Sequence, residues 1–143
     1  MISDTLLHPP PAPPADRLDT AIREVMRPGV IVIAGHASVA RAQHALLAHG
    51  VHAILVLDDA GGRPLGWVTS RGLLHWAERD VTLCSARDAV SEAPVTIDPS
   101  ATARDALALL RRADTTRLLV VRGDDGVPEG VVADVDLLRL VAR

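Results

Sequence analysis

The second half of the sequence repeats the first half without a gap when the chain is shifted by 64 residues. The matches lie at apolar and turn positions, and they begin with Ile33 on Ile97 and end with Leu73-Leu74 on Leu137-Leu138. The other matches pair Ala42, Leu46, Leu55-Val56, Gly62, Pro64, Gly66 and Val68 with Ala106, Leu110, Leu119-Val120, Gly126, Pro128, Gly130 and Val132. Repeated core and turn residues predict two copies of one supersecondary unit.

Each copy shows the same order of secondary-structure signals. A short apolar strand precedes a capped amphipathic helix, a hairpin of two strands follows, and a second capped helix closes the unit. In the first copy the strand is expected at 30–33 and the helix from the cap Ser38 to about His49. The hairpin strands are expected at 53–57 and 65–69 around the turn 58–62, and Ser70 caps the closing helix. In the second copy the strand is expected at 95–97 and the helix from the cap Thr102 to Ala113. The hairpin strands are expected at 118–121 and 130–133 around the turn 123–126, and Asp134 caps the closing helix. The unit is therefore predicted to be β-α-β-β-α.

The duplication predicts one α+β domain with an α/β sandwich-like arrangement, whose tandem repeats are related by a pseudo-twofold axis. Residues 1–16 form a predicted Pro-rich tail, because five of the ten Pro lie between Pro9 and Pro14. The first repeat is placed at 17–80 and the second at 81–143. A unit of roughly 55 residues buries too little surface to be stable alone, so the repeats are expected to share one core. The tail is interpreted as a simple extension, with a Pro-rich docking ligand as the alternative.

The composition excludes several classes of function. All fifteen basic residues are Arg, so a Walker A loop and a Schiff-base Lys are both absent. With two Trp, no Phe or Tyr and a net charge of -3, a nucleic-acid partner is not expected. Cys84 is the single Cys, which argues against a disulfide framework and favours a reducing, cytoplasmic compartment. The chain contains no apolar run near the roughly 20 residues that span a bilayer and no secretory leader, so no membrane association is expected.

Two groups of residues resemble metal sites, but their spacing and position argue against metal binding. Five of the six His lie in the first copy, yet His44 and His49 are five residues apart and splay to different helix faces. The acidic pairs at 58–59 and 124–125 lie in hairpin turns, where Asp is favoured for backbone reasons. We therefore expect no metal site and no required cofactor.

The two closing helices carry more apolar residues than one buried stripe requires. These residues are Leu73, Leu74, Trp76 and Ala77 in the first copy and Leu137, Leu138, Leu140 and Val141 in the second. The excess predicts a homodimer through the closing helices, with deeper burial inside one chain as the alternative.

The tandem unit resembles the CBS domain pair, or Bateman module, of the stand-alone bacterial type. The likeness covers about residues 20–142. It rests on Val25-Met26 before the first strand, Ala42 in the first helix, Gly66-Trp67-Val68-Thr69 leading into Leu73-Leu74, and the basic-then-apolar strand that begins at Arg117. The resemblance implies a regulatory module without catalytic residues. Such a module senses AMP, ADP, ATP or S-adenosylmethionine in clefts between its repeats.

The family's ligand signature is glycine, two apolar residues, Thr or Ser, two variable residues and Asp, and this sequence divides it between the copies. The first copy keeps the hydroxyl at Thr69 but has Gly72 where the carboxylate belongs. The second keeps Asp136 but has Ala133 in place of the hydroxyl. A carboxylate one turn into a helix suits a ribose diol, and a hydroxyl at a helix N-terminus suits a phosphate.

The candidate ligand-binding residues follow from this resemblance. Asp136 is the ribose-binding candidate, with a solvated first-turn Asp as the alternative, and Arg117 is a phosphate candidate that a surface ion pair would also explain. The remaining candidates are Asp134 in the second copy, Thr69 and Arg71 in the first, and Val95 and Ile97, which would flank an adenine ring.

The predicted function is that of a sensor which binds an adenosine-type ligand at the second copy and signals through its own assembly or an unidentified protein partner. The alternative is an assembly module with a degenerate cleft, indifferent to nucleotides. No nucleophile-base pairing recurs in the sequence, so an enzyme is not expected.

Overall fold

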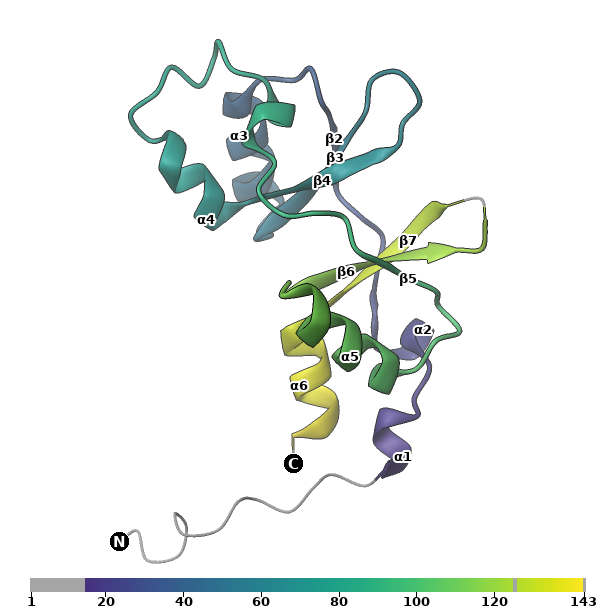
Figure 1. The fold of residues 1–143 in the computed structure, drawn as a ribbon. Coiled ribbons are helices and arrows are strands. Elements are labelled where there is room, and N and C mark those ends of the chain that lie inside the picture. Colours follow the sequence, from purple (N-terminus) through teal and green to yellow (C-terminus); the bar gives the residue numbers. More distant parts are fainter. Residues whose placement is uncertain (1–14, 125, 143) are drawn as a thin grey trace, which may run out of the picture.

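Two small sheets face each other in the computed structural model, which describes residues 15–124 and 126–142 (Figure 1). The first sheet has the order β2-β3-β4 and consists of β2 (Val32–Ala34), β3 (Ala53–Leu57) and β4 (Pro64–Thr69). The second has the order β1-β7-β6-β5 and consists of β1 (Arg27–Pro28), β5 (Thr96–Ile97), β6 (Arg117–Arg122) and β7 (Val127–Ala133). In each repeat the first strand pairs parallel with the second, and the hairpin strands pair antiparallel.

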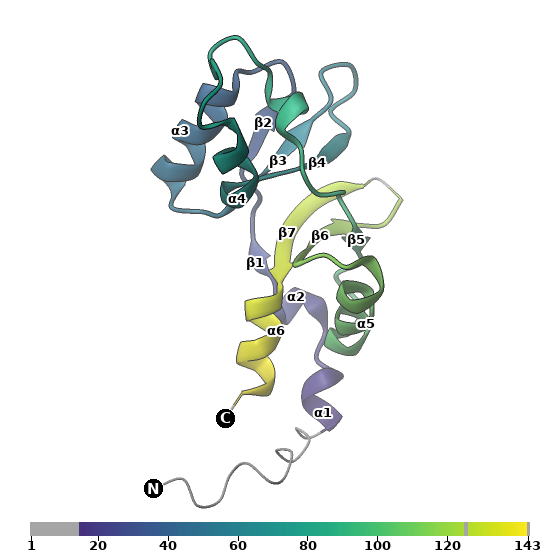
Figure 2. The same ribbon diagram turned by 60° about the vertical axis from the view of Figure 1, so that its left-hand side comes forward.

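The helices lie on the outer sides of the two sheets (Figure 2). The first repeat carries α3 (Val39–His49) and α4 (Ser70–Leu73), which continues into the 3₁₀ turn η1 (Leu74–Trp76). The second repeat carries α5 (Ala103–Ala113) and α6 (Asp134–Val141). The predicted α+β class and the β-α-β-β-α order of each repeat are therefore confirmed.

Helix caps account for where the long helices begin. The predicted caps Ser38 and Thr102 are confirmed: the Ser38 hydroxyl accepts the backbone N–H of Arg41, and Thr102 also forms a capping box with Asp105. The predicted caps Ser70 and Asp134 are wrong by one residue, because both already belong to their helices. The cap of α4 is Thr69, whose hydroxyl accepts the N–H of Gly72.

The segment at the start of each repeat packs on the other repeat. We call residues 20–28 and 84–92 the crossing segments; they contain α2 (Ile22–Val25) and β1, and the 3₁₀ turn η2 (Ala86–Ala89), respectively. Isolated bridges join Ala21 to Thr102 and Ser85 to Ser38, which are equivalent pairs under the 64-residue shift. A further helix, α1 (Ala15–Leu18), lies beside α5 and α6. The chain thus exchanges its two crossing segments about the pseudo-twofold axis.

The expected single core is instead two cores with a seam between them. The core of the first repeat includes Ala86 and Ala89 of the second crossing segment, and the core of the second repeat includes Ile22 of the first. A small third cluster of Leu55, Trp67 and Leu119 joins the facing sheets. Each core is therefore completed by the crossing segment of the other repeat, and the two repeats do not share one large core.

Two glycines permit the close approach of these segments. A Cβ at Gly66 would lie 2.5 Å from the Glu92 carbonyl oxygen, and a Cβ at Gly130 would overlap the carbonyl oxygen of Arg27. Because the obstacle is backbone in both cases, only glycine fits at these two equivalent positions.

Most of the predicted tail, residues 1–14, lies outside the described residues, and positions 15 and 16 begin α1. None of the helices within 15–124 and 126–142 has the length and apolar character needed to traverse a lipid bilayer.

Candidate functional site

Asp136 is a buried carboxylate in the first turn of α6. The residue is 7% exposed, and its Oδ2 accepts the backbone N–H of Ala133 at 2.8 Å. This bond satisfies one of the free donors at the helix N-terminus, where a negative charge is also stabilised by the helix dipole. The fold therefore holds the predicted ribose-binding candidate in one orientation at the start of an eight-residue helix.

Two guanidinium groups contact the other oxygen of Asp136. Arg27 Nε donates to Oδ1 at 3.2 Å, and Arg139 Nη1 lies 3.7 Å from the same atom. The Arg27 side chain is 60% exposed although its partner is buried. Arg27 belongs to β1 in the first crossing segment, so the Asp136 site combines residues from both ends of the chain. Sequence reasoning missed Arg27, whose contact depends on the exchange of crossing segments.

A shallow cavity of about 370 Å³, broadly open to solvent, lies beside Asp136. This volume falls within the range of small-molecule sites. Its walls come from α1–α2, β1 and α6, and the lining residues are Thr20, Glu24, Val25, Arg27, Asp136, Arg139 and Leu140. The site therefore offers a carboxylate, two cations and apolar surface from Val25 and Leu140.

The equivalent place in the first copy is occupied by the protein itself. Thr69 is 6% exposed, its hydroxyl caps α4, and it lies 3.3 Å from Ser91 Oγ. A Cβ at Gly72 would lie 3.0 Å from the same Ser91 oxygen. Arg71 is exposed and has no ion pair with any described residue. The structure thus places Thr69 at the N-terminus of α4, where the ligand signature predicts a hydroxyl, but it does not direct Arg71 toward that site.

Arg117 lies in the seam between the sheets. Its Nε is 3.5 Å from Glu92 Oε1, and its Nη2 donates to Thr116 Oγ1 at 2.9 Å. Glu92 also accepts from the Thr115 hydroxyl, and it belongs to the second crossing segment. Arg117 is therefore engaged by a carboxylate of the chain, and it does not line the cavity at Asp136.

The other three candidates are also separate from that cavity. Ile97 is 6% exposed in the core of the second repeat, and Val95 packs partly buried against the same core. Asp134 is exposed and accepts the N–H of Val135. Of the seven predicted residues, only Asp136 lies on the cavity wall.

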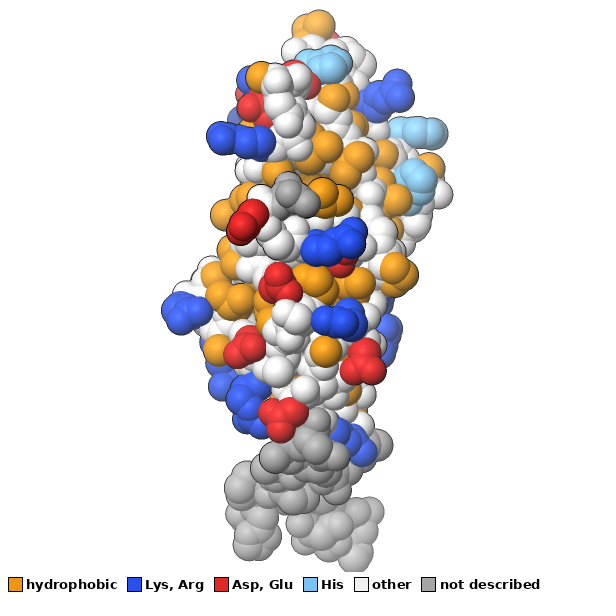
Figure 3. Space-filling view, turned by 90° about the vertical axis from the view of Figure 1, so that its right-hand side faces the viewer, with side chains coloured by type: hydrophobic (Ala, Val, Ile, Leu, Met, Phe, Trp, Pro, Cys, Tyr) orange, Lys and Arg blue, Asp and Glu red, His pale blue; other side chains and the backbone are white. Residues whose placement is uncertain are grey.

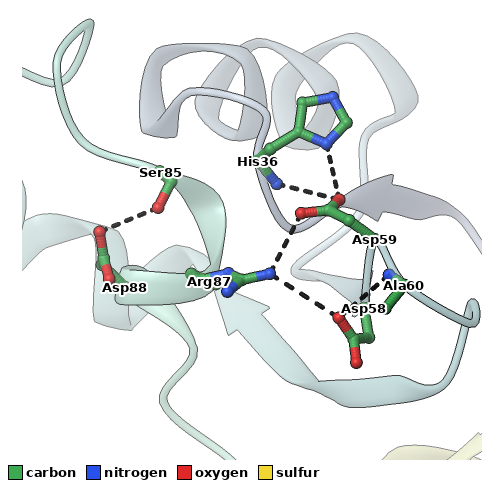
Figure 4. A network of polar contacts seen from close by, with 7 residues as sticks. All are labelled: His36, Asp58, Asp59, Ala60, Ser85, Arg87 and Asp88. Atoms are coloured by element: carbon green, nitrogen blue, oxygen red, sulfur yellow. Dashed lines mark hydrogen bonds and ion pairs between the residues drawn. The ribbon is translucent and has the colours of Figure 1, made fainter.

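A polar network that the sequence did not reveal joins the first hairpin to the second crossing segment (Figure 4). Asp59 Oδ1 lies 2.6 Å from His36 Nδ1, and Arg87 Nη2 donates to Asp59 Oδ2 at 3.1 Å. The hydrogen bond from His36, aided by Arg87, lowers the pKa of Asp59. Asp58 at 3.8 Å from Arg87 completes the cluster. The network fixes the crossing segment against the turn 58–62.

The His and acidic residues of the described chain do not assemble into a group of three or more that would hold a metal ion. Cys84 is a free, partly buried thiol at the start of the second crossing segment.

The closing helices keep part of their apolar surface exposed. Leu74 is 74% exposed and Leu138 is 61% exposed, and the two occupy equivalent positions in the repeats. Leu73 and Leu137 are buried beneath them. Figure 3 shows hydrophobic side chains interspersed with acidic and basic ones over the middle of one face of the molecule.

Comparison with solved structures finds the same fold at low sequence identity. The CBS domain of a bacterial CNNM/CorC family Mg²⁺ transporter in complex with ATP is 20% identical, with a TM-score of 0.76, over 88% of this chain and 89% of that chain. A CBS domain protein from Pyrobaculum aerophilum complexed with AMP is 19% identical, with a TM-score of 0.71, over 86% and 99%. Hypoxic Response Protein I with two coordinated zinc ions is 21% identical, with a TM-score of 0.69, over 84% and 98%.

A comparison with curated proteins finds no match. The family model of the CBS domain matches the chain twice, at residues 22–79 and 86–143, in agreement with the duplication. The chain therefore belongs to the CBS domain family and contains a tandem pair of these domains.

Proposed function

We propose that this protein is a regulatory module that binds one adenosine-type nucleotide per chain, in the cavity beside Asp136. The observation that carries the proposal is the buried Asp136 carboxylate, held by the Ala133 N–H on a cavity wall. Carboxylate oxygens accept two hydrogen bonds from a ribose diol, and Val25 and Leu140 offer apolar contact surface. The AMP and ATP complexes of two structural relatives support this ligand class.

One site per chain follows from the difference between the copies. In the first copy, Ser91 and Thr69 fill the space in front of Gly72, and the residue at the carboxylate position has no side chain. The second copy has both the carboxylate and the cavity. We therefore expect AMP, ADP or ATP to bind beside Asp136 and not beside Gly72.

Nucleotide binding would act on the rest of the protein through the first crossing segment. The cavity is lined by α2 and β1 on one side and α6 on the other, so an occupant contacts both. Occupancy would favour one arrangement of these elements over another, which is a population shift without any bond-making step.

If the protein forms a homodimer through the closing helices, this population shift would change how the two copies associate. Leu74 and Leu138 are exposed at equivalent positions, so a second copy related by a twofold axis would cover both with the same kind of surface. Replacement of both Leu by Asp should give monomers in sedimentation velocity, whereas an unchanged sedimentation coefficient would remove this part of the proposal.

Calorimetry with AMP, ADP, ATP and S-adenosylmethionine tests the sensor. Asp136→Asn keeps an oxygen that accepts the Ala133 N–H but removes the charge, so it should abolish or strongly weaken binding while the protein stays folded. Asp124→Asn, in the exposed turn of the second hairpin, is the matched control and should bind as the wild type does. Absence of heat with every ligand would favour the alternative, an assembly module indifferent to nucleotides.

A further inference from the structure

The Asp136 carboxylate is already occupied by a side chain of the protein. Its Oδ2 accepts from Ala133, and its Oδ1 accepts from Arg27 Nε at 3.2 Å. With Arg27 on Oδ1 the Asp136 side chain is only 5% exposed, so a ribose diol that binds this carboxylate competes with Arg27 for access to Oδ1.

The first copy has an equivalent but smaller contact between its crossing segment and its closing helix. The 64-residue shift places Arg27 on Ser91 and Asp136 on Gly72. Ser91 Oγ lies 3.0 Å from the position of a Cβ on Gly72, so both crossing segments point a polar side chain at the same turn of the closing helix. The contact is therefore built into the exchanged fold, and in the second copy it brings a cation to a carboxylate.

We propose that Arg27 is a specificity-determining residue that occupies Asp136 in the empty protein and selects phosphorylated nucleotides over neutral nucleosides. This inference rests on the nucleotide-binding function proposed above.

The selection follows from where Arg27 can go once displaced. Its side chain is 60% exposed and lines the cavity together with Arg139 and Glu24. A neutral nucleoside takes the carboxylate and leaves Arg27 without its partner. A phosphate attached to the same ribose accepts from the displaced guanidinium, so the lost ion pair is replaced by a charge-assisted contact.

The expected discrimination is set by one charge-assisted hydrogen bond. Such a bond changes affinity by about 10- to 100-fold, so AMP should bind the wild type tighter than adenosine by that factor. In Arg27→Ala, adenosine should bind more tightly than it binds the wild type, because its competitor for Asp136 is gone. AMP should lose its advantage, and the ratio of the two dissociation constants should fall by about tenfold or more.

Titration calorimetry of AMP and adenosine against wild type, Arg27→Ala and Arg122→Ala tests this selection. Arg122 is a matched control, because it is 71% exposed and paired with Glu129 on the second hairpin, outside the cavity lining. A folding defect would weaken both ligands together, whereas the predicted role changes their ratio. An unchanged ratio in Arg27→Ala would overturn the selection alone. Failure of both ligands to bind the wild type would overturn the proposed nucleotide site and this inference with it.

Discussion

Gly130→Ala tests whether close contact between β1 and β7 holds the site together. The added methyl group would overlap the carbonyl oxygen of Arg27 and lie 2.9 Å from Met26 Sδ. Ordinary contacts between such atoms are about 3.5 Å or longer, so the first crossing segment has to move away from β7. β1 pairs with β7 over only two residues, Arg27 with Val131 and Pro28 with Gly130, and a shift of this size would break that pairing.

Forced overpacking costs about 1 to 3 kcal/mol, and we expect about 2 to 3 kcal/mol here because the obstacle is backbone. With a urea m-value of about 2 kcal/mol/M, the unfolding midpoint should fall by roughly 1 to 1.5 M. Gly61→Ala is the matched control, because a Cβ at Gly61 would meet no atom within 4 Å. The reasoning is refuted if the two variants unfold within about 0.5 kcal/mol of each other.

Three further predictions concern the cap, the seam and the polar network. Thr102→Ala should lower the free energy of unfolding by about 1 kcal/mol in urea titration, because α5 loses its capping box; an effect near zero would contradict that role. Leu119→Ala should cost about 2 to 5 kcal/mol, since Leu119 is fully buried between the sheets, and a surface-like cost below about 0.5 kcal/mol would mean that the seam is not packed. Asp59→Asn should lower the melting temperature at pH 7. Because folding lowers the pKa of Asp59 below its ordinary 3.8, its contribution is present above that value and is lost as pH falls through the folded pKa. The difference from wild type should therefore vanish in strong acid, and a difference that persists there would contradict the ion pair.

The architecture of each repeat was predictable because its signals are local. Caps such as Ser38 and Thr102, together with the apolar strands, fix the elements, and the duplication doubles each signal. The caps of the closing helices were predicted one residue too late. In α6 the cap position is Ala133, which has no side-chain acceptor, and Asp136 satisfies the backbone from inside the helix instead.

The exchange of crossing segments was not predictable from the repeat itself. A pattern that recurs after 64 residues does not say whether Ile22 packs on its own repeat or on the other one. For the same reason the Arg27–Asp136 and Arg87–Asp59 pairs, which join distant parts of the chain, gave no sequence signal. Arg117 was expected just before a strand and is the first residue of β6, and its partner Glu92 depends on the same exchange.

A crystal structure of the protein in complex with AMP would test the account most directly. The account predicts one AMP per chain, with its ribose hydroxyls on Asp136 and the Arg27 guanidinium turned from the carboxylate to the phosphate. Nucleotide bound beside Gly72 and Thr69, or Arg27 still paired with Asp136 at saturating AMP, would contradict it.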